Sequence, residues 1–203
     1  MRLHWSPKSP YVRKVMVCAH VLGLAQRMEL VRSVAAMLKP NPTIMHDNPL
    51  SKIPTLILDD GSTLFDSVVI CEYLNDLAQG TLFPQEPQAK WQALRWHALA
   101  DGLLDALILW RNERDRPDGA KLQTLINAFD LKTRATLDLL ESEAVAVAAS
   151  PLSIGTISIG CALGYLDFRF DQLGWRASRP QLAQWFAHLE QSPSFVATQV
   201  VDG

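Results

Sequence analysis

Asp66 and Ser67 stand where an apolar, strand-like segment runs into a segment with helical periodicity, so both fall at the start of a helix. A residue in that position most simply caps the helix, because its side-chain oxygen accepts a hydrogen bond from a free backbone N–H. The same geometry has a second use, since the free N–H groups and the positive end of the helix dipole can bind a carboxylate. In that case the Ser67 hydroxyl is a further donor and Asp66 contacts an ammonium group. Taken alone, the pair favours the cap.

Ile53 and Pro54 precede another strand-like run, Thr55 to Leu58. The residue before a proline avoids the helical region, so the usual meaning is an extended entry into the sheet. A cis Ile53–Pro54 bond is the alternative, although cis forms are a small minority of such bonds. It would turn the backbone N–H and C=O of Ile53 outward, where an extended peptide could pair with them as an added strand.

Ser9 lies next to Pro10 at the start of a helical pattern that runs from Tyr11 to Leu22. A serine followed by a proline is an ordinary pair for the residue before a helix and the first residue within it. A hydroxyl at this point can also donate a hydrogen bond to an anion, helped by the helix dipole. Ser6, which also precedes a proline, and Tyr11 are the competing hydroxyls.

These three candidate positions depend on the elements that hold them. In the first part of the chain, the pattern predicts a strand at residues 3–5, a helix at 11–22 and a strand at 27–32. An ambiguous segment broken by prolines follows at residues 33–46, then a hairpin at 55–65 and a helix at 67–77. Asp59, Asp60 and Gly61 form the hairpin turn, where glycine supplies the positive φ that such turns need.

From residue 89 onward no segment has the alternation of a strand. Long helical patterns cover residues 89–114, 121–143, 153–173 and 180–191, and proline or glycine breakers separate them. We therefore divide the chain into a domain at residues 1–79, a linker at residues 80–87 and an all-helical domain at residues 88–203.

The composition is that of a soluble globular protein, because 48% of the residues are apolar and the formal net charge is only -2. Basic and acidic residues are interleaved, so we expect neither a nucleic-acid partner nor a membrane surface. The amino terminus lacks the apolar core of a signal peptide, which favours a cytoplasmic protein. The three cysteines fit a reduced core and the histidines lack metal-ligand spacing, so we predict no metal.

Three groups of residues together resemble the glutathione S-transferase family, and most of all its bacterial serine-type members. They are Ser9-Pro10-Tyr11-Val12-Arg13-Lys14, then Asn48-Pro49 with Lys52-Ile53-Pro54-Thr55-Leu56, then Phe65-Asp66-Ser67 ahead of Tyr73-Leu74. The order of elements resembles the family over nearly the whole chain. The resemblance implies a thioredoxin-like α/β domain with a mixed four-stranded sheet, which holds glutathione. An all-α domain follows it and completes the pocket of the second substrate.

Taken residue by residue, the resemblance implies that Ile53 pairs through its backbone with the cysteinyl unit of glutathione, beside cis-Pro54. Asp66 and Ser67 then hold the γ-glutamyl end. Lys52 either directs its positive charge toward a carboxylate or is simply solvated. Glutathione is the expected cosubstrate.

The resemblance also implies a task for one hydroxyl group. A free thiol has a pKa of about 8.5, so little thiolate is present at neutral pH, and thiolate is the nucleophile. A hydroxyl donor at the start of the first helix stabilises the anion. We expect Ser9 to be that donor, because Arg13 follows four residues later as in serine-type relatives, and Ser6 is the alternative.

The helical domain leaves the roles of several charged residues open. Asp101 either lies on a polar helix face or, as in some relatives, reaches the glutathione of a partner subunit. Arg111, Arg114 and Arg116 are interleaved with acidic residues, which favours a solvated helix end over an anion site.

The segment from Ser153 to Thr156 stands where the family has a capping box before a buried helix. Thr156 replaces the aspartate of that box, and Gly155 has a low helix propensity. We therefore expect the following helix to begin weakly.

The leading hypothesis is a dimeric glutathione transferase whose thiolate, stabilised by Ser9, attacks an electrophilic small molecule. One alternative is a non-catalytic dimer of the same fold that binds a ligand or a protein. Another is a glutathione-dependent peroxidase or thiol reductase. A serine rather than a cysteine at position 9 argues against disulfide exchange through a protein thiol.

Overall fold

The computed structural model describes residues 1–200, which form two compact units. The first comprises Met1–Gln85 together with the segment that begins at Ser192, and the second comprises Glu86–Gln191. This division differs from the sequence expectation, which placed residues 88–203 in one helical domain. The helix α10 (Pro193–Val196) instead packs against α1 (Pro10–Val21) of the first unit. Residues 201–203 of the expected domain lie outside the described residues.

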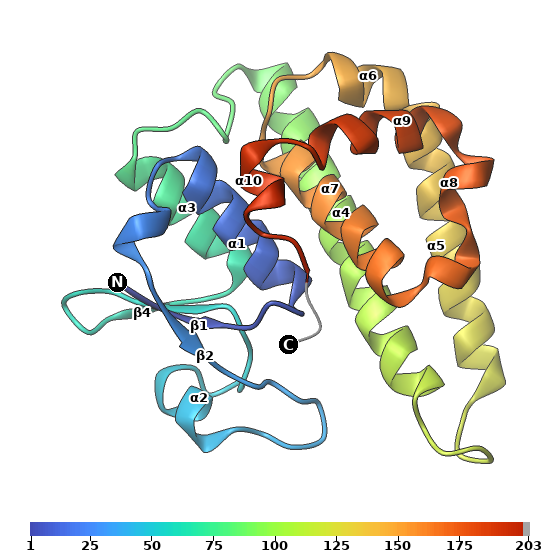
Figure 1. Ribbon diagram of the computed structural model, residues 1–203, viewed down its shortest axis with the longest axis horizontal. Coiled ribbons are helices and arrows are strands. Elements are labelled where there is room, and N and C mark those ends of the chain that lie inside the picture. The colour runs from blue at the N-terminus through green and yellow to red at the C-terminus, as the bar shows by residue number, and fades with distance from the viewer. Residues whose placement is uncertain (201–203) are drawn as a thin grey trace. The chain divides into compact units, whose positions relative to one another are not determined.

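The first unit contains one mixed sheet of four strands, in the order β2-β1-β3-β4. Its remaining elements are β1 (Arg2–Trp5), η1 (Ala25–Arg27), β2 (Glu29–Arg32), α2 (Pro42–Asp47), β3 (Thr55–Ile57), β4 (Thr63–Leu64) and α3 (Ser67–Leu77). β1 and β2 are parallel, whereas β3 is antiparallel to both β1 and β4. Figure 1 shows α1 and α3 together on one side of the sheet and α2 on the other. The predicted thioredoxin-like α/β arrangement is confirmed.

The core of the first unit lies between the sheet and the pair of helices α1 and α3. Leu3 of β1 and Leu56 of β3 are paired in register, and both are fully buried. Ile70 and Leu74 of α3 are also fully buried, because a spacing of four residues puts them on one helix face.

The cysteines are buried and outside any disulfide: Cys18, Cys71 and Cys161.

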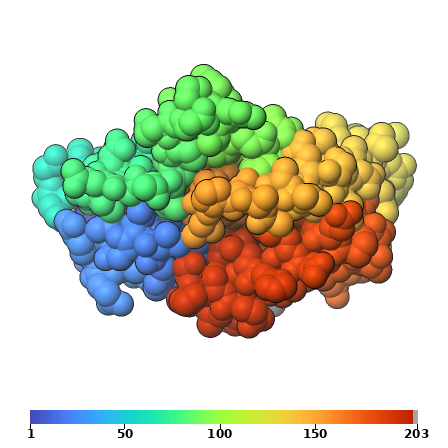
Figure 2. All heavy atoms as spheres, turned by 90° about the horizontal axis from the view of Figure 1, so that it is seen from above, coloured from blue at the N-terminus to red at the C-terminus, as the bar shows by residue number. Residues whose placement is uncertain are grey.

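The second unit, residues 86–191, contains helices and no strand, as predicted. Its elements are α4 (Pro87–Arg114), α5 (Gln123–Ser142), α6 (Ala144–Ala149), α7 (Ile154–Arg169), η2 (Asp171–Leu173), α8 (Trp175–Ser178) and α9 (Pro180–Leu189). α7 is the central helix: it packs along α4, and its residues are buried almost without interruption. α6 and α9 also pack on each other and lie side by side in orange and red in Figure 2. Among residues 1–200, no helix is both long and apolar enough to cross a bilayer.

The start of α7 corrects the expectation of a weak helix. The Ser153 N–H donates to Thr156 Oγ1 at 2.9 Å and the Thr156 N–H donates to Ser153 Oγ at 3.5 Å, so the capping box forms with threonine. Gly155 lies against α4, where an added Cβ would come within 2.5 Å of the Ala93 carbonyl oxygen. Glycine is therefore required by the close approach of two helices, and the burial of α7 offsets its low helix propensity.

Candidate functional site

The strand register brings the predicted site residues to one edge of the sheet. β1 and β2 end at this edge, β3 begins there, and β4, antiparallel to β3, ends there. The loops at this edge carry Ser9 after β1, Ile53-Pro54 before β3, and Asp66-Ser67 after β4. Three segments that are far apart in the sequence therefore reach the same end of the sheet.

Ser9 is the N-cap of α1, and Pro10 is the first helical residue. Ser9 Oγ accepts a hydrogen bond from the Val12 N–H at 3.3 Å. No acceptor within residues 1–200 receives the hydroxyl hydrogen of Ser9. The same hydroxyl can therefore cap the helix and donate to a ligand, so the two interpretations of Ser9 are compatible.

The two competing hydroxyls lie in different settings. Ser6 is in the loop ahead of α1, where its Oγ accepts from the Lys8 N–H at 3.4 Å. Tyr11 is the second residue of α1, and Lys14 Nζ lies 5.7 Å from the centroid of its ring. Ser9 is the one of the three that occupies the N-cap, where the helix dipole and the free N–H groups act together.

The Ile53–Pro54 peptide bond is cis, which was the alternative interpretation of the sequence. Pro54 is buried and Ile53 is half-buried. None of the described residues forms a hydrogen bond with the backbone of Ile53. Its N–H and C=O are therefore available to an extended ligand.

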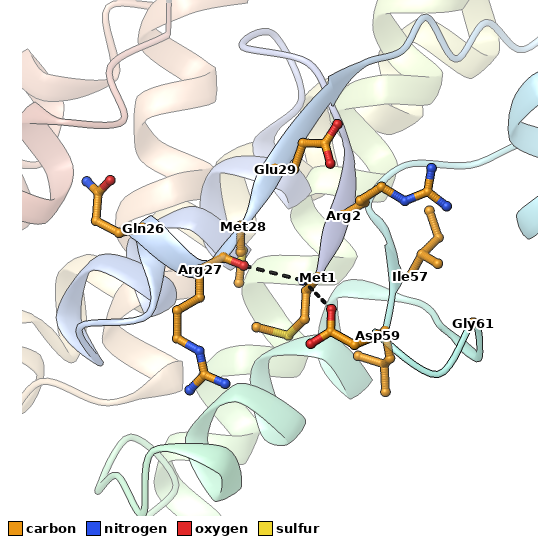
Figure 3. Close-up of a pocket in the computed structure, with 10 residues that line it drawn as sticks. Met1, Arg2, Gln26, Arg27, Met28, Glu29, Ile57, Asp59 and Gly61 are labelled. Carbon is orange, nitrogen blue, oxygen red and sulfur yellow. Dashed lines mark hydrogen bonds and ion pairs between the residues drawn. The ribbon is translucent and has the colours of Figure 1, made fainter.

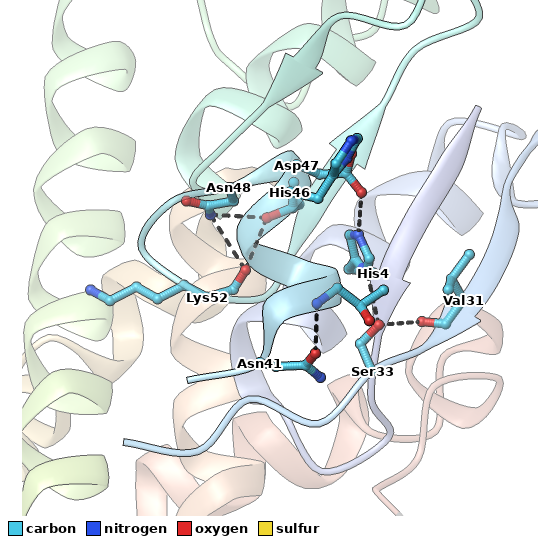
Figure 4. Close-up of polar contacts among 10 residues, drawn as sticks. His4, Val31, Ser33, Asn41, His46, Asp47, Asn48 and Lys52 are labelled. Carbon is cyan, nitrogen blue, oxygen red and sulfur yellow. Dashed lines mark hydrogen bonds and ion pairs between the residues drawn. The ribbon is translucent and has the colours of Figure 1, made fainter. Parts of the chain in front are cut away.

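Asn48 holds the loop that presents Ile53, a role the sequence did not predict. This side chain is only 1% exposed. Its Nδ2 donates to Thr55 Oγ1 at 3.0 Å and to the Lys52 carbonyl at 3.4 Å, and its Oδ1 accepts from the Leu50 N–H at 3.0 Å. The Lys52 side chain is exposed and extends away from this network (Figure 4). The loop is thus fixed from inside while the charge of Lys52 faces solvent.

Asp66 is the N-cap of α3, and its Oδ1 accepts from the Val68 N–H at 2.9 Å. The preceding Phe65–Asp66 bond is also cis. Because Asp66 is exposed and the cap uses one carboxylate oxygen, the other oxygen can contact an ammonium group. Ser67, the first residue of α3, is only 2% exposed, which limits the contact that a ligand can make with its hydroxyl.

A buried polar network at the same edge was missed by the sequence analysis. His4 Nδ1 lies 2.7 Å from Ser33 Oγ, and His4 Nε2 lies 2.8 Å from Asp47 Oδ2 (Figure 4). Hydrogen bonds from His4 and His46 hold the pKa of Asp47 below its usual range. The network ties the ends of β2 and α2 to β1. Its members are 29 and 43 residues apart in the sequence, so no local pattern reveals it.

No group of three or more His, Cys, Asp or Glu side chains among residues 1–200 is arranged to hold a metal ion. The Asp47 carboxylate, with two histidines beside it, serves as a hydrogen-bond acceptor for both.

Asp101 forms a contact within its own helix. Its Oδ2 lies 3.3 Å from Nε2 of His97, one turn earlier in α4, and His97 is buried. This contact gives Asp101 a local partner, in addition to the role in a partner subunit that the sequence left open.

The arginine cluster divides into two parts. Arg116 pairs with an acidic residue of α4 at 3.1 Å and is exposed, as expected for a solvated helix end. Arg114 donates to the carbonyl of Arg169 at 2.8 Å, and Arg111 donates to the Tyr165 hydroxyl at 3.4 Å. Arg111 and Arg114 therefore turn toward α7 rather than into solvent.

A surface cavity of about 640 Å³ lies at the opposite edge of the sheet, beside the start of β1 and the β3–β4 turn (Figure 3). Here the Met1 amino group lies 2.8 Å from Asp59 Oδ1 and 3.4 Å from the Arg27 carbonyl oxygen. None of the predicted site residues lines this cavity. We therefore place the candidate site at the other edge.

Comparisons with known proteins cover both units. The family model for the N-terminal domain of glutathione S-transferases matches residues 8–77, a range that includes every predicted site residue. The chain is 30% identical over 202 residues to the "Uncharacterized GST-like protein YibF" of Escherichia coli (strain K12), and the match covers 98% of each chain.

Two crystal structures of glutathione transferase family members from Pseudomonas fluorescens Pf-5 are also similar. One contains bound glutathione, is 43% identical with a TM-score of 0.94, and the match covers 98% of each chain. The other contains bound S-(propanoic acid)-glutathione and is 42% identical with a TM-score of 0.91. That match covers 99% of this chain and 100% of the other.

Proposed function

Because the chain belongs to the glutathione S-transferase family, we propose that it binds glutathione at the sheet edge that carries Ser9, Ile53 and Asp66. In this proposal the glutathione thiolate attacks an electrophilic small molecule. The observation that carries it is the convergence at one edge of a capping hydroxyl with an unused hydrogen, an unpaired backbone and an exposed capping carboxylate. Relatives with bound glutathione and a bound glutathione conjugate support it.

The tripeptide binds by its backbone and by both charged ends. The N–H and C=O of Ile53, beside Pro54, pair with the cysteinyl unit as in an added strand. Asp66 accepts from the γ-glutamyl ammonium group, and the first turn of α3, which begins at Ser67, faces the carboxylate of the same unit. Lys52 supplies a positive charge for the carboxylate at the other end.

Ser9 then stabilises the thiolate. A hydrogen bond to a charged group contributes about 1.5–3 kcal/mol, whereas a helix dipole contributes about 0.3–1 kcal/mol at an exposed site. Since one pKa unit corresponds to about 1.4 kcal/mol, the hydroxyl alone can lower the thiol pKa by roughly one to two units. The hydroxyl is therefore the larger effect, and the α1 dipole adds to it.

The proposed function includes a cell compartment, an oligomeric state and a set of binding partners. We infer a cytoplasmic homodimer that uses glutathione as cosubstrate and a small-molecule electrophile as second substrate. It involves no metal, no nucleic acid and no membrane. Family membership and the near-neutral charge of the chain support these points.

Calorimetric titration with glutathione tests the binding step. We expect saturable binding to the wild type, and weaker binding to Asp66→Ala because that change removes the carboxylate facing the ammonium group. The absence of saturable binding to the wild type would overturn the proposed function.

A second candidate is a non-catalytic binding protein of the same fold. The observation that favours it is the hydrogen bond from Val12 to Ser9, because a helix cap is sufficient reason for a serine at this position. Steady-state assays with electrophiles, peroxides and mixed disulfides separate the candidates. Turnover of electrophiles supports the transferase, turnover of peroxides or disulfides supports the peroxidase or reductase, and glutathione binding without any turnover supports the binding protein.

A further inference from the structure

We propose that His4, a buried residue of β1, is a positioning residue for glutathione, because its hydrogen bond to Asp47 fixes the loop that presents the backbone of Ile53. The inference rests on the proposed function, since it names a residue that sets the affinity of that same site. All the groups involved belong to the first compact unit.

Hydrogen bonds join the loop that carries Ile53 to both ends of α2. At the start of the helix, the Asn41 N–H donates to Ser51 Oγ at 2.8 Å. At its end, the Ser51 N–H donates to the Asn48 carbonyl at 2.9 Å, and the Asn48 side chain holds the backbone of residues 50 and 52. The position of α2 on the sheet therefore decides where the loop, and with it Ile53, lies.

Two neighbouring residues of the sheet hold the end of α2. His4 and Thr55 are directly opposite in the β1–β3 register, so their side chains lie on the same face of the sheet. His4 Nε2 lies 2.8 Å from Asp47 Oδ2, and Asn48 Nδ2 donates to Thr55 Oγ1 at 3.0 Å. Thr55 follows the loop directly in sequence, whereas His4 is 43 residues away from Asp47 and ties the helix to a different strand.

The direction of the bond from His4 follows from its acceptor. The pKa of Asp47 is held below its usual range, so this side chain is a carboxylate at neutral pH and can only accept. Nε2 therefore carries the hydrogen. On the other side of the ring, Nδ1 lies 2.7 Å from Ser33 Oγ and fixes the ring orientation (Figure 4). Because His4 is only 2% exposed, solvent cannot take the place of this charge-assisted bond.

His46 is the matched contrast, because it contacts the same carboxylate. Its Nδ1 lies 3.0 Å from Asp47 Oδ1, but it is the preceding residue of the same helix and its side chain is 85% exposed. Its contact is local and does not tie α2 to the sheet. The same substitution at His4 and at His46 therefore separates the two kinds of contact.

The test is calorimetric titration of glutathione into the full chain. His4→Asn places an amide near the position of Nδ1, where it can reach Ser33 but not Asp47. His4→Gln extends an amide to the position of Nε2, where it can still donate to Asp47. His46→Asn is the control for the local contact, and Ser153→Ala is the control for a loss of stability in the other unit.

We expect His4→Asn to bind glutathione about fivefold to tenfold more weakly than the wild type. Without the bond to Asp47, the loop also occupies positions that do not match the peptide, and the apparent Kd rises as the competent fraction falls. His4→Gln, His46→Asn and Ser153→Ala should bind nearly as the wild type does. The pKa of the bound glutathione thiol, followed by ultraviolet absorbance, should be the same in His4→Asn as in the wild type, because Ser9 lies on another loop.

Asp47→Ala removes the same bond from the side of the helix and should weaken glutathione binding by a similar factor. It provides the test if His4→Asn does not fold. Wild-type affinity in Asp47→Ala or in folded His4→Asn would overturn the positioning role and leave the proposed function standing.

Three further results would also overturn the positioning role alone. They are equal weakening by His4→Gln, which keeps the donor, equal weakening by either control, and a raised pKa of the bound thiol in His4→Asn. If the wild type itself does not bind glutathione, the proposed function is overturned and this inference with it.

Discussion

Within residues 1–200, two helices begin with a serine whose side chain accepts a capping hydrogen bond, one in each unit, and the two serines differ in burial and in whether the cap is bonded back. Ser153 at the start of α7 is buried, and its backbone N–H and side-chain oxygen both bond to Thr156. Ser9 at the start of α1 is half-buried, accepts from the Val12 N–H and keeps its hydroxyl hydrogen without an acceptor in the described residues. We call the Ser153 cap closed, because it is buried and bonded to Thr156 in both directions, and the Ser9 cap open, because it is half-buried and within reach of a ligand.

The difference shows that a capping sequence alone does not separate stability from function. Both serines follow the same local rule for helix starts. What separates them is burial, and whether a residue of the same turn bonds back to the cap. The comparison predicts that changing the open cap mainly affects activity, whereas changing the closed cap or its surroundings mainly affects stability.

The largest effect should come from Ser9→Ala. Loss of one donor to a reacting anion typically lowers kcat by about 100-fold or more, while glutathione binding, which depends on other groups, should persist. Loss of the cap should reduce the free energy of unfolding by about 1 kcal/mol. Steady-state kinetics with an electrophile measures the first effect, and Ser6→Ala is the control with near wild-type turnover. An unchanged turnover number in Ser9→Ala would contradict the assignment of Ser9 as the hydrogen-bond donor to the thiolate.

The next effect should come from Gly155→Ala, at the closed cap. The added methyl group would meet the Ala93 carbonyl oxygen of α4, so the helices must separate. Overpacking of this kind lowers the free energy of unfolding by about 1–3 kcal/mol, which urea denaturation measures.

Gly102 supplies the matched control, because it lies in α4 with no atom near the position of an added Cβ. Gly102→Ala should stabilise the protein by about 0.5–1 kcal/mol through helix propensity. Equal effects of the two substitutions would show that close packing at Gly155 is not the reason for its glycine.

A smaller effect is expected from Ser153→Ala. Removing the cap oxygen should lower the free energy of unfolding by about 1 kcal/mol and leave kcat per folded molecule unchanged. Thr156→Ser keeps the hydroxyl of the box and should retain most of the stability. If Ser153→Ala lowered kcat as strongly as Ser9→Ala, the contrast between the two caps would be lost.

The smallest effect is the change of the unfolding free energy with pH that is due to Asp47, at the same edge of the sheet as the open cap. The folded pKa of Asp47 lies below the ordinary value of 3.8 because of its hydrogen bonds to His4 and His46. The folded state therefore binds fewer protons than the unfolded state, so this stabilisation is present above about pH 4 and is lost as the pH falls through the lowered pKa.

We expect the difference in unfolding free energy between the wild type and Asp47→Asn to shrink over that acidic range. Urea denaturation at a series of pH values measures it. A difference that stays constant from neutral to acidic pH would contradict this role of Asp47.

Much of the fold could be predicted because its signals are local. The predicted helix starts at Ser9-Pro10 and Asp66-Ser67 coincide with α1 and α3, since a cap depends on residues within one turn. The segment at residues 33–46 stayed ambiguous, and the structure places an isolated bridge between Ala36 and Lys39 ahead of α2. The expected helical domain ran to residue 203, whereas α10 packs on α1 of the first unit, a contact that joins distant parts of the chain and leaves no local signal.

The loops that carry the predicted site residues meet in the structure, whereas the residues that support these loops were not predicted. Proline and capping signals made Ile53 and Asp66 candidates, and the register brings their loops to one edge. Asn48 and His4 were not predicted, because their hydrogen bonds depend on residues that meet only after folding. Such contacts leave no periodicity or motif in the sequence.

The most direct test of the open cap is the pKa of the glutathione thiol while it is bound. The ultraviolet absorbance of the thiolate, followed against pH, gives this pKa for the wild type and for Ser9→Ala. We expect the bound thiol of the wild type to titrate roughly one to two units below its free value of about 8.5, and that of Ser9→Ala to return toward the free value. The same lowered pKa in both proteins would contradict the role of Ser9.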